Sequence, residues 1–244
     1  MRKFLLGVPL DDDSPEKIVS GVLNGSRYCQ IFVNVHKIVQ FNTNQELRTI
    51  SADKDCVFSP DGRWIQWLAK IGGYALKKRF GGLEVLQRFC RLSEENGAGI
   101  YILGAKPDIL RLAIEELKRR FPKAVILDSR HGYGFSHAAV VDDLRALRAK
   151  ILFLALPTPQ KELLGHKLFR EIDSLCYVSG VGGALDILAG KSRRAPGWVQ
   201  AIGMEWLYRC LQEPIRLSGR YFGDAVKLIR IIFTVTFIAE EAPE

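Results

Sequence analysis

The residue with the clearest chemical potential is Asp61, in the run Ser59-Pro60-Asp61-Gly62. It follows a short apolar run that we expect to be a strand. A carboxylate at the end of a strand can reach a substrate hydroxyl and take its proton as a general base. Pro-Asp-Gly is also a common β-turn sequence, so a turn without chemistry is the alternative. The residue types alone leave both interpretations open.

Two glycine-containing turns could hold a phosphate. The run Gly180-Val181-Gly182-Gly183 lies between an expected strand and an expected helix, where backbone amides and the helix N-terminus favour an anion. It lacks the complete G-x-G-x-x-G dinucleotide pattern, because Leu185 stands at the position of the last glycine. Gly104-Ala105-Lys106 is a weaker candidate of the same kind. A tight turn without a ligand is the alternative for both.

The sequence does not predict a metal site, a cofactor or a covalent nucleophile. His131 and His137 are six residues apart, which does not place two ligands on one face of a helix. The aspartates at 11–13 precede Ser14-Pro15, where acids at the start of a helix are expected. The five cysteines are scattered and contain no C-x-x-C pair, so we expect buried thiols.

These residues must be positioned by an α/β domain with a Rossmann-like, mostly parallel sheet and flanking helices. Apolar runs alternate with stretches of helical period from residue 30 to residue 190, and runs that are apolar throughout are typical of strands buried on both faces. The expected strands are Gln30–Val35, Cys56–Phe58, Gly99–Leu103, Ala124–Leu127, Ile151–Leu156 and Leu175–Ser179. Helices are expected around 83–90, from Pro107 to Phe121, and around 140–147.

Ligands of open α/β sheets bind beyond the carboxyl ends of the strands. The residues that follow each expected strand are therefore the candidates for a site. We expect loops there at 34–36, 59–62, 104–107, 157–162 and 179–183.

The chain changes character near residue 190, which divides it into an α/β domain at 1–190 and a basic helical appendage at 191–244. One helix is expected over Gly197–Leu211, and Pro214 starts another. On this second helix one side carries the cations Arg216, Arg220, Lys227 and Arg230, and the other side carries Tyr221, Phe222, Ala225, Leu228, Ile229 and Ile232.

The appendage holds most of the excess positive charge. Residues 191–230 contain eight Lys and Arg against three acids, so this segment supplies +5 of the net charge of +8. Such a helix suits an anionic lipid surface, or it packs its apolar side on the main domain and leaves the cations in water. Nucleic acid is not expected, since no reading module or stacking aromatics accompany the cations. The apolar surface could also drive self-association.

Composition excludes several classes of protein. A chain of 244 residues with 48% hydrophobic and 25% charged residues is globular rather than disordered. No uncharged stretch is long enough to span a membrane. The start of the sequence does not fit a secretory signal peptide, because Pro9 and three aspartates follow a short apolar run. We therefore expect a cytoplasmic protein.

An ordered set of motifs resembles the bacterial WecG/TagA/CpsF glycosyltransferases over nearly the whole chain. The most specific is the stretch from Gly180 to Gly190, GVGGALDILAG, followed by Arg194-Ala-Pro-x-Trp198. The other similar motifs are Phe4–Pro9, Phe32–Asn34, Pro60–Gly62, Arg79–Glu84, Gly132–Phe135, Pro159–Glu162, Glu205–Arg209 and Glu213–Arg216.

The resemblance implies an inverting, metal-independent transfer of a hexose from a UDP-sugar to a polyprenyl-diphosphate-linked saccharide, at the inner face of the cell membrane. The hexose is glucose, N-acetylmannosamine or its uronic acid. Asp61 then becomes the general base that takes the proton of the acceptor hydroxyl. The resemblance assigns substrate binding to Asn34, Arg79, Gly104, Gln160, Lys161, Gly182, Gly183, Asp186, Arg209, Arg216 and Arg220.

Three positions depart from the family pattern. Glu84 replaces an aspartate, Phe32 stands where threonine is frequent, and Gln160-Lys161 inverts a Lys-Gln order, so either of these two could contact the ligand. The rival interpretation is a non-catalytic nucleotide-binding or lipid-docking module in which Asp61 is only a turn residue.

Overall fold

The structure is a computed structural model that describes residues 3–11, 13–73, 76 and 81–238, without the side chains of Arg216 and of residues 235–238. The strands are β1 Lys3–Leu5, β2 Val8–Leu10, β3 Tyr28–Val33, β4 Cys56–Pro60, β5 Ile100–Gly104, β6 Ile126–Arg130, β7 Ile151–Ala155 and β8 Tyr177–Gly180. The helices are α1 Pro15–Leu23, α2 Val35–Thr43, α3 Gln45–Ser51, α4 Arg63–Ile71, α5 Gly82–Asn96, α6 Pro107–Arg120, α7 His137–Ala146, α8 Gln160–Glu171, α9 Ala184–Leu188, α10 Gly197–Ala201, α11 Glu205–Gln212 and α12 Pro214–Ile238.

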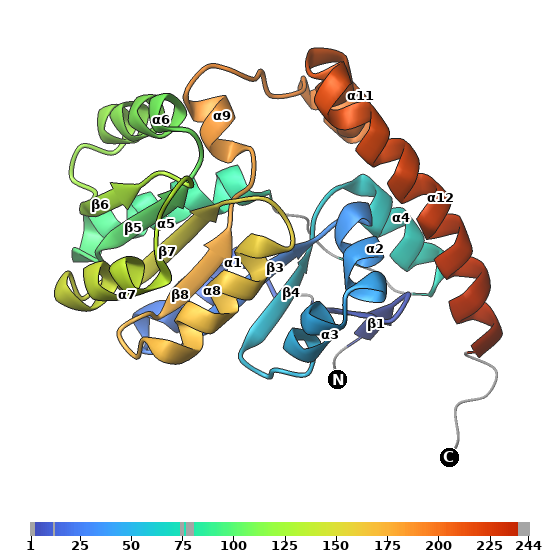
Figure 1. Cartoon of the computed structure of the whole chain (residues 1–244), viewed down its shortest axis with the longest axis horizontal. Helices are drawn as coiled ribbons and strands as arrows, with labels where there is room; N and C mark the ends of the chain where they lie inside the picture. Colours follow the sequence, from blue (N-terminus) through green and yellow to red (C-terminus); the bar gives the residue numbers. More distant parts are fainter. Residues whose placement is uncertain (1–2, 12, 74–75, 77–80, 239–244) are drawn as a thin grey trace.

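Six parallel strands form the central sheet in the order β4-β3-β8-β7-β5-β6, which confirms the predicted Rossmann-like α/β class (Figure 1). All six predicted strands are present, with ends shifted by a few residues. The loop expected at 34–36 is wrong, because β3 ends at Val33 and Asn34 already caps α2. Ser59 and Pro60 likewise belong to β4, and Gln160–Glu162 belong to α8.

Helices cover both faces of the sheet, since successive strand residues point to opposite sides. On one face, β3 residues Cys29, Ile31 and Val33 pack with the buried sides of α2, α3, α7 and α8. On the other face, Phe32 shares a core with the buried sides of α1, α5, α6 and α9. The prediction that the runs of apolar residues form strands buried on both faces of the sheet is therefore confirmed.

The candidate site lies where two neighbouring strands are followed by helices on opposite faces of the sheet. β3 leads into α2 on one face, whereas its neighbour β8 leads into α9 on the other face. This divergence is the topological switch point of a doubly wound sheet, at which ligands bind. Asn34 follows β3, Asp61 follows β4, and the glycine-rich turn follows β8.

The N-terminal hairpin β1–β2 was not predicted. Its turn places Leu6 at φ 48° and Gly7 at φ 76°, and the left-handed backbone of a leucine gives no sequence signal. Leu5, Val8 and Leu10 are buried in the core. Beyond the hairpin, Ser14 caps α1 and Asp13 pairs with Lys17, as expected for acids at a helix start, while Asp12 lies outside the described residues.

The predicted single helix over Gly197–Leu211 is wrong, because the chain forms α10 and α11 with a break at Gly203. Gly203 has φ 72°, a left-handed conformation that ends the first helix. The indole Nε1 of Trp64 in α4 donates a 3.0 Å hydrogen bond to the Gly203 carbonyl oxygen and holds this break against the main domain. The division of the chain at residue 190 stays a prediction.

The helix expected after Pro214 is present as α12, which lies along α2 in Figure 1. The prediction that its apolar side packs on the domain is wrong in part. Among the side chains of α12 that the structure describes, Leu217, Asp224 and Ile231 are buried, whereas Phe222 and Ile229 are 75% and 55% exposed. We call Phe222, Val226, Ile229 and Phe233 the outer stripe. Over the residues described, no helix is long and apolar enough to cross a bilayer.

Candidate active site

Asp61 lies at the carboxyl end of β4, beside the first turn of α2. Its amide N–H donates to the Val33 carbonyl oxygen at 2.8 Å, which continues the pairing of β3 and β4. Its Oδ2 accepts a 3.3 Å hydrogen bond from the side-chain amide of Asn34. Gly62, at φ 87°, then turns the chain into α4. The Pro-Asp-Gly run therefore joins a strand to a helix and presents the carboxylate at the sheet edge.

The surroundings of Asp61 raise the pKa of its carboxyl. Desolvation is the main cause, and the negative charge of Glu205, in α11, acts in the same direction. The hydrogen bond from Asn34 and the positive charges of Arg209 and Lys37 oppose this shift. A raised pKa makes the carboxylate a stronger base, which favours proton abstraction.

Three charged side chains, two of them buried, lie between α2 and α8 beside the site. Lys37 and Glu162 form an ion pair, and both are 5% exposed. Lys161 Nζ lies 3.4 Å from a Glu162 carboxylate oxygen and donates to the Thr158 hydroxyl at 2.6 Å. Burial, followed by repulsion from Lys37, lowers the pKa of Lys161 to about 8. Gln160 is exposed, so of the two candidates Lys161 is the one turned inward.

The turn after β8 joins the sheet to the short helix α9. Gly182 has φ 53°, and Gly183 caps α9. The guanidinium of Arg209, in α11, lies against Gly183, where any added side chain would overlap it, and Asp186 is adjacent. Two predicted elements of the site, the glycine turn and an arginine of the appendage, therefore meet.

The other predicted residues have less direct support. Gly104 has φ 128° and its Cα faces the Ala155 backbone so closely that a Cβ would clash, which explains the glycine by strand packing. Arg220 is exposed, with its guanidinium 5.1 Å from the Tyr221 ring centroid. Arg79 and the side chain of Arg216 lie outside the described residues.

Five functional candidates were missed from the sequence. They are His36, Lys37, Glu162, Glu205 and Asp224, and each is charged or titratable in a helix, where a solvated position is the usual expectation. For Lys37 a weak signal existed, because it directly precedes the apolar pair Ile38-Val39 at the start of α2.

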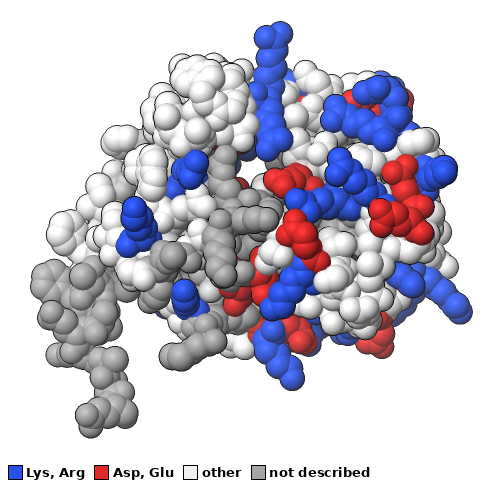
Figure 2. Space-filling view, turned by 180° about the vertical axis from the view of Figure 1, so that it is seen from behind, with Lys and Arg blue, Asp and Glu red and all other residues white. Residues whose placement is uncertain are grey.

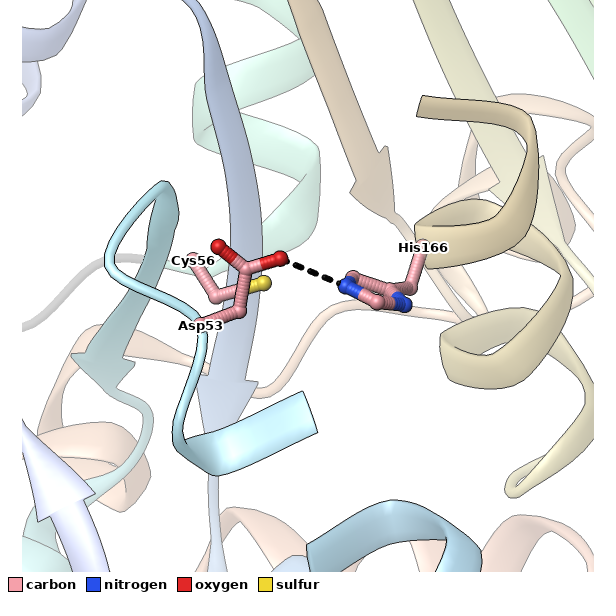
Figure 3. A group of neighbouring side chains, drawn as sticks. All are labelled: Asp53, Cys56 and His166. Atoms are coloured by element: carbon pink, nitrogen blue, oxygen red, sulfur yellow. Dashed lines mark hydrogen bonds and ion pairs between the residues drawn. The ribbon is translucent and has the colours of Figure 1, made fainter. Parts of the chain in front are cut away.

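A group of metal-type ligands lies at the opposite edge of the sheet. Asp53, Cys56 and His166 have ligand atoms within 4.8 Å of one another, and Figure 3 shows His166 facing the Asp53 carboxylate. His166 Nε2 lies 2.7 Å from Asp53 Oδ2, which also accepts from Arg170 Nε at 2.7 Å. The Arg170 guanidinium thus already supplies the positive charge that balances the Asp53 carboxylate. Cys56 begins β4 whereas Asp61 follows its end, so this group does not face the candidate active site.

The charge on the surface is unevenly distributed. In Figure 2 the left side of the face, where the appendage lies, is mostly white with a few separated blue side chains, and red side chains gather toward the centre and right. The outer stripe and Trp198, which is 69% exposed, are apolar residues of this appendage. Exposed apolar residues with interspersed cations are typical of a surface that meets a membrane or a protein.

Comparison with known proteins places the chain in a family of glycosyltransferases. Residues 4–240 match the Glycosyl transferase WecG/TagA/CpsF family. The chain belongs to this family, as the motifs at Asp61 and Gly180–Gly190 predicted.

Two curated relatives share the printed name N-acetylglucosaminyldiphosphoundecaprenol N-acetyl-beta-D-mannosaminyltransferase. The protein from Bacillus spizizenii is 29% identical and the one from Bacillus subtilis 25% identical, each over 157 residues, or 64% of this chain. The chain spans 61% of the length of each of these relatives.

Proposed function

We propose that this protein is an inverting glycosyltransferase that moves a hexose from a UDP-sugar to a polyprenyl-diphosphate-linked saccharide in cell-surface polysaccharide synthesis. The observation that carries the proposal is the meeting of Asp61 with Asn34 and the appendage beyond the switch point of the sheet. Family membership supports the same reaction class.

In this mechanism the Asp61 carboxylate accepts the proton of the acceptor hydroxyl. The acceptor oxygen forms a bond to C1 of the donor sugar while the bond from C1 to the diphosphate oxygen breaks. The electron pair of that bond leaves with UDP, and attack from the opposite face inverts C1. Asn34 holds Asp61 through its amide, and Asn34 itself is fixed because its Oδ1 caps α2 by accepting from the Lys37 N–H at 3.1 Å.

The leaving diphosphate needs positive charge where its own charge grows. The amides of Gly182 and Gly183, the Arg209 guanidinium and the Lys161 ammonium are the groups that we assign to it. These cations support transfer without a metal ion. Arg220 approaches the same region from α12, since its charge contributes to the lowered pKa of Lys161.

The relatives suggest which substrates to test first. Their names specify an N-acetylmannosaminyl donor group and an N-acetylglucosaminyl-diphosphoundecaprenol acceptor. We therefore propose UDP-N-acetylmannosamine as the first donor, with UDP-glucose and the uronic acid form as the alternatives.

The test is a transfer assay in metal-free buffer with Asp61→Asn as the variant. We expect turnover to fall by roughly 100-fold or more with UDP affinity retained, because asparagine cannot take the proton. Asp142→Asn, an exposed acid on α7, is the matched control. UDP binding without any turnover by the wild type on the three donors would favour the non-catalytic module instead.

We also propose that the acceptor is met at an anionic membrane surface on the cytoplasmic side, with the appendage as the contact. The exposed outer stripe and the cations Lys227 and Arg230 support a helix that lies in the interface. Nucleic acid is not a proposed partner. Self-association through the same apolar residues is the competing use of this surface, and gel filtration with and without lipid separates the two.

A further inference from the structure

Asp224 is the one acidic residue in the sequence of α12, which carries the four cations Arg216, Arg220, Lys227 and Arg230. It is also among the few residues of this helix that face the main domain, with 6% of its surface exposed. A carboxylate is costly to bury unless a partner compensates its charge and hydrogen bonds. The position of Asp224 therefore calls for a specific partner on the domain.

That partner is His36, in the first turn of α2. His36 Nδ1 lies 2.8 Å from Asp224 Oδ2, and the two side chains are 21% and 8% exposed. His36 is two residues beyond Asn34, the residue that caps α2 and donates to Asp61. The contact thus joins the appendage to the turn that holds the proposed base.

Apolar packing continues on both sides of this contact. Leu217 and Ile231 of α12 are buried, and Leu228 packs against the core that includes α2 residues Ile38 and Phe41. Asp224 lies between these residues along the helix, so its bond to His36 selects one register of α12 on α2.

The register of α12 determines where two arginines lie. Arg220 precedes Asp224 by about one helical turn. The adjacent Tyr221 ring lies 5.6 Å from the ring of Trp206 in α11, and α11 also carries Arg209, whose guanidinium lies on Gly183. A shift of α12 would therefore move Arg220 directly and Arg209 through the contact between α12 and α11.

We propose that His36 and Asp224 form a latch that holds the appendage closed over Asp61. They are positioning residues, and neither is assigned to contact the substrate. The inference rests on the proposed function for its catalytic consequence, while the closed contact itself is independent of any activity.

Four variants of the full chain test the latch. His36→Leu leaves the Asp224 carboxylate buried without its partner, which is more damaging than the replacement of both side chains. Asp224→Leu and the double variant His36→Leu with Asp224→Leu replace the pair by apolar packing. Ser218→Ala, at an exposed position on the same helix that has no assigned role, is the control for a substitution that leaves the pair intact.

The first readout is hydrogen exchange of the amides in residues 214–238. We expect exchange to accelerate at least ten-fold in His36→Leu and to return toward the wild-type rate in the double variant. Unchanged exchange in His36→Leu would overturn the latch whether or not any sugar is transferred. Recovery in the double variant shows that the single variant opened the helix rather than misfolding the domain.

The second readout is kcat and KM for the UDP-sugar. We expect kcat/KM to fall at least ten-fold in His36→Leu, to recover in the double variant and to be unchanged in Ser218→Ala. Accelerated exchange with wild-type kcat/KM would overturn the positioning role. If the wild type transfers no sugar, the proposed function fails, and the exchange data alone then decide whether the latch holds α12 on α2.

Discussion

Single residues set the proton affinity of the Asp61 carboxylate. Charges of both signs surround it, and they come from two parts of the chain: Lys37 belongs to α2, whereas Glu205 and Arg209 belong to α11 of the appendage. The position of the appendage therefore affects the pKa of the proposed base as well as the shape of the candidate site. The dependence of kcat/KM on pH should therefore respond to each of these charges in a known direction.

Substitution of these charged residues should shift the acidic limb of the plot of kcat/KM against pH. Glu205→Gln removes a negative charge that raises the pKa of Asp61, so the limb moves to lower pH. Arg209→Gln removes a positive charge that lowers the same pKa, so the limb moves to higher pH, together with a loss of rate. The measurement is kcat/KM from acid to neutral pH. Shifts of the same sign in both variants would contradict the assignment of Asp61 as the base.

Lys161 should produce an alkaline limb. Its pKa of about 8 means that the free protein loses this positive charge above that pH, and diphosphate binding weakens. In Lys161→Arg the charge persists, so the decline of kcat/KM near pH 8 should disappear. Gln160→Ala, at the exposed neighbouring position, should keep the decline. An identical alkaline limb in Lys161→Arg would assign the titration to another group.

The residues that could be predicted are those that follow strands. The positions of Asp61 and Gly182 could be predicted because the carboxyl ends of parallel strands lie at one edge of the sheet, whatever the detailed packing. His36 and Asp224 could not be found, since their pairing depends on the register of two helices that are 188 residues apart in sequence. The same limit applies to Glu162, whose partner Lys37 lies on another helix.

At the scale of elements, the α9 turn and α11 fit together because Gly183 has no side chain. Gly183→Ala should displace the Arg209 guanidinium, while the backbone at Gly183, with φ −76°, accepts alanine. We expect UDP affinity to fall roughly ten-fold, the loss of about one charged hydrogen bond. Calorimetry measures it. Gly197→Ala, at the start of α10 with open space around it, should bind UDP like the wild type.

A second pair of elements, α8 and the loop before β4, is joined by Asp53. Desolvation raises the pKa of Asp53, but hydrogen bonds from Arg170 and His166 outweigh it and lower the value to about 2. Because the folded pKa lies below the ordinary one, the stabilisation is complete at neutral pH and is lost as the pH falls toward 2.

Asp53→Asn should therefore lower the free energy of unfolding by about 2 kcal/mol at pH 7, and the difference should shrink on acidification. Urea unfolding at several pH values measures this. Asp55→Asn, at a more exposed partner of Arg170, should cost less than about 1 kcal/mol. Equal losses for the two variants at pH 7 would show that burial does not govern this cluster.

Helices and strands could be predicted where a hydrophobic periodicity or an apolar run extends over several residues. The six strands of the sheet met this condition. The helix predicted over Gly197–Leu211 failed because the spacing of Trp198, Ile202 and Trp206 fits a continuous helix, whereas Gly203 and the Trp64 hydrogen bond end α10 there. The tertiary contact from Trp64 thus prevailed over the helical periodicity of the local sequence.

At the scale of the whole molecule, α12 uses two different faces. The face with Leu217 and Asp224 packs on the domain, which leaves the outer stripe and the cations Lys227 and Arg230 for another surface. Docking on the domain therefore does not compete with docking on a membrane. The proposed latch and the proposed membrane contact can therefore exist together.

This arrangement predicts how membrane binding fails. Phe222→Glu with Ile229→Glu places two carboxylates in the outer stripe, and it should abolish sedimentation with anionic vesicles, because both apolar burial and attraction to the lipid charge are lost. UDP affinity should be retained, since the latch face is untouched. Leu112→Glu, at a 36% exposed position on α6, is the control. If the double variant sediments like the wild type, the outer stripe does not meet the membrane. If the double variant also no longer self-associates on gel filtration, the outer stripe forms contacts between copies of the chain.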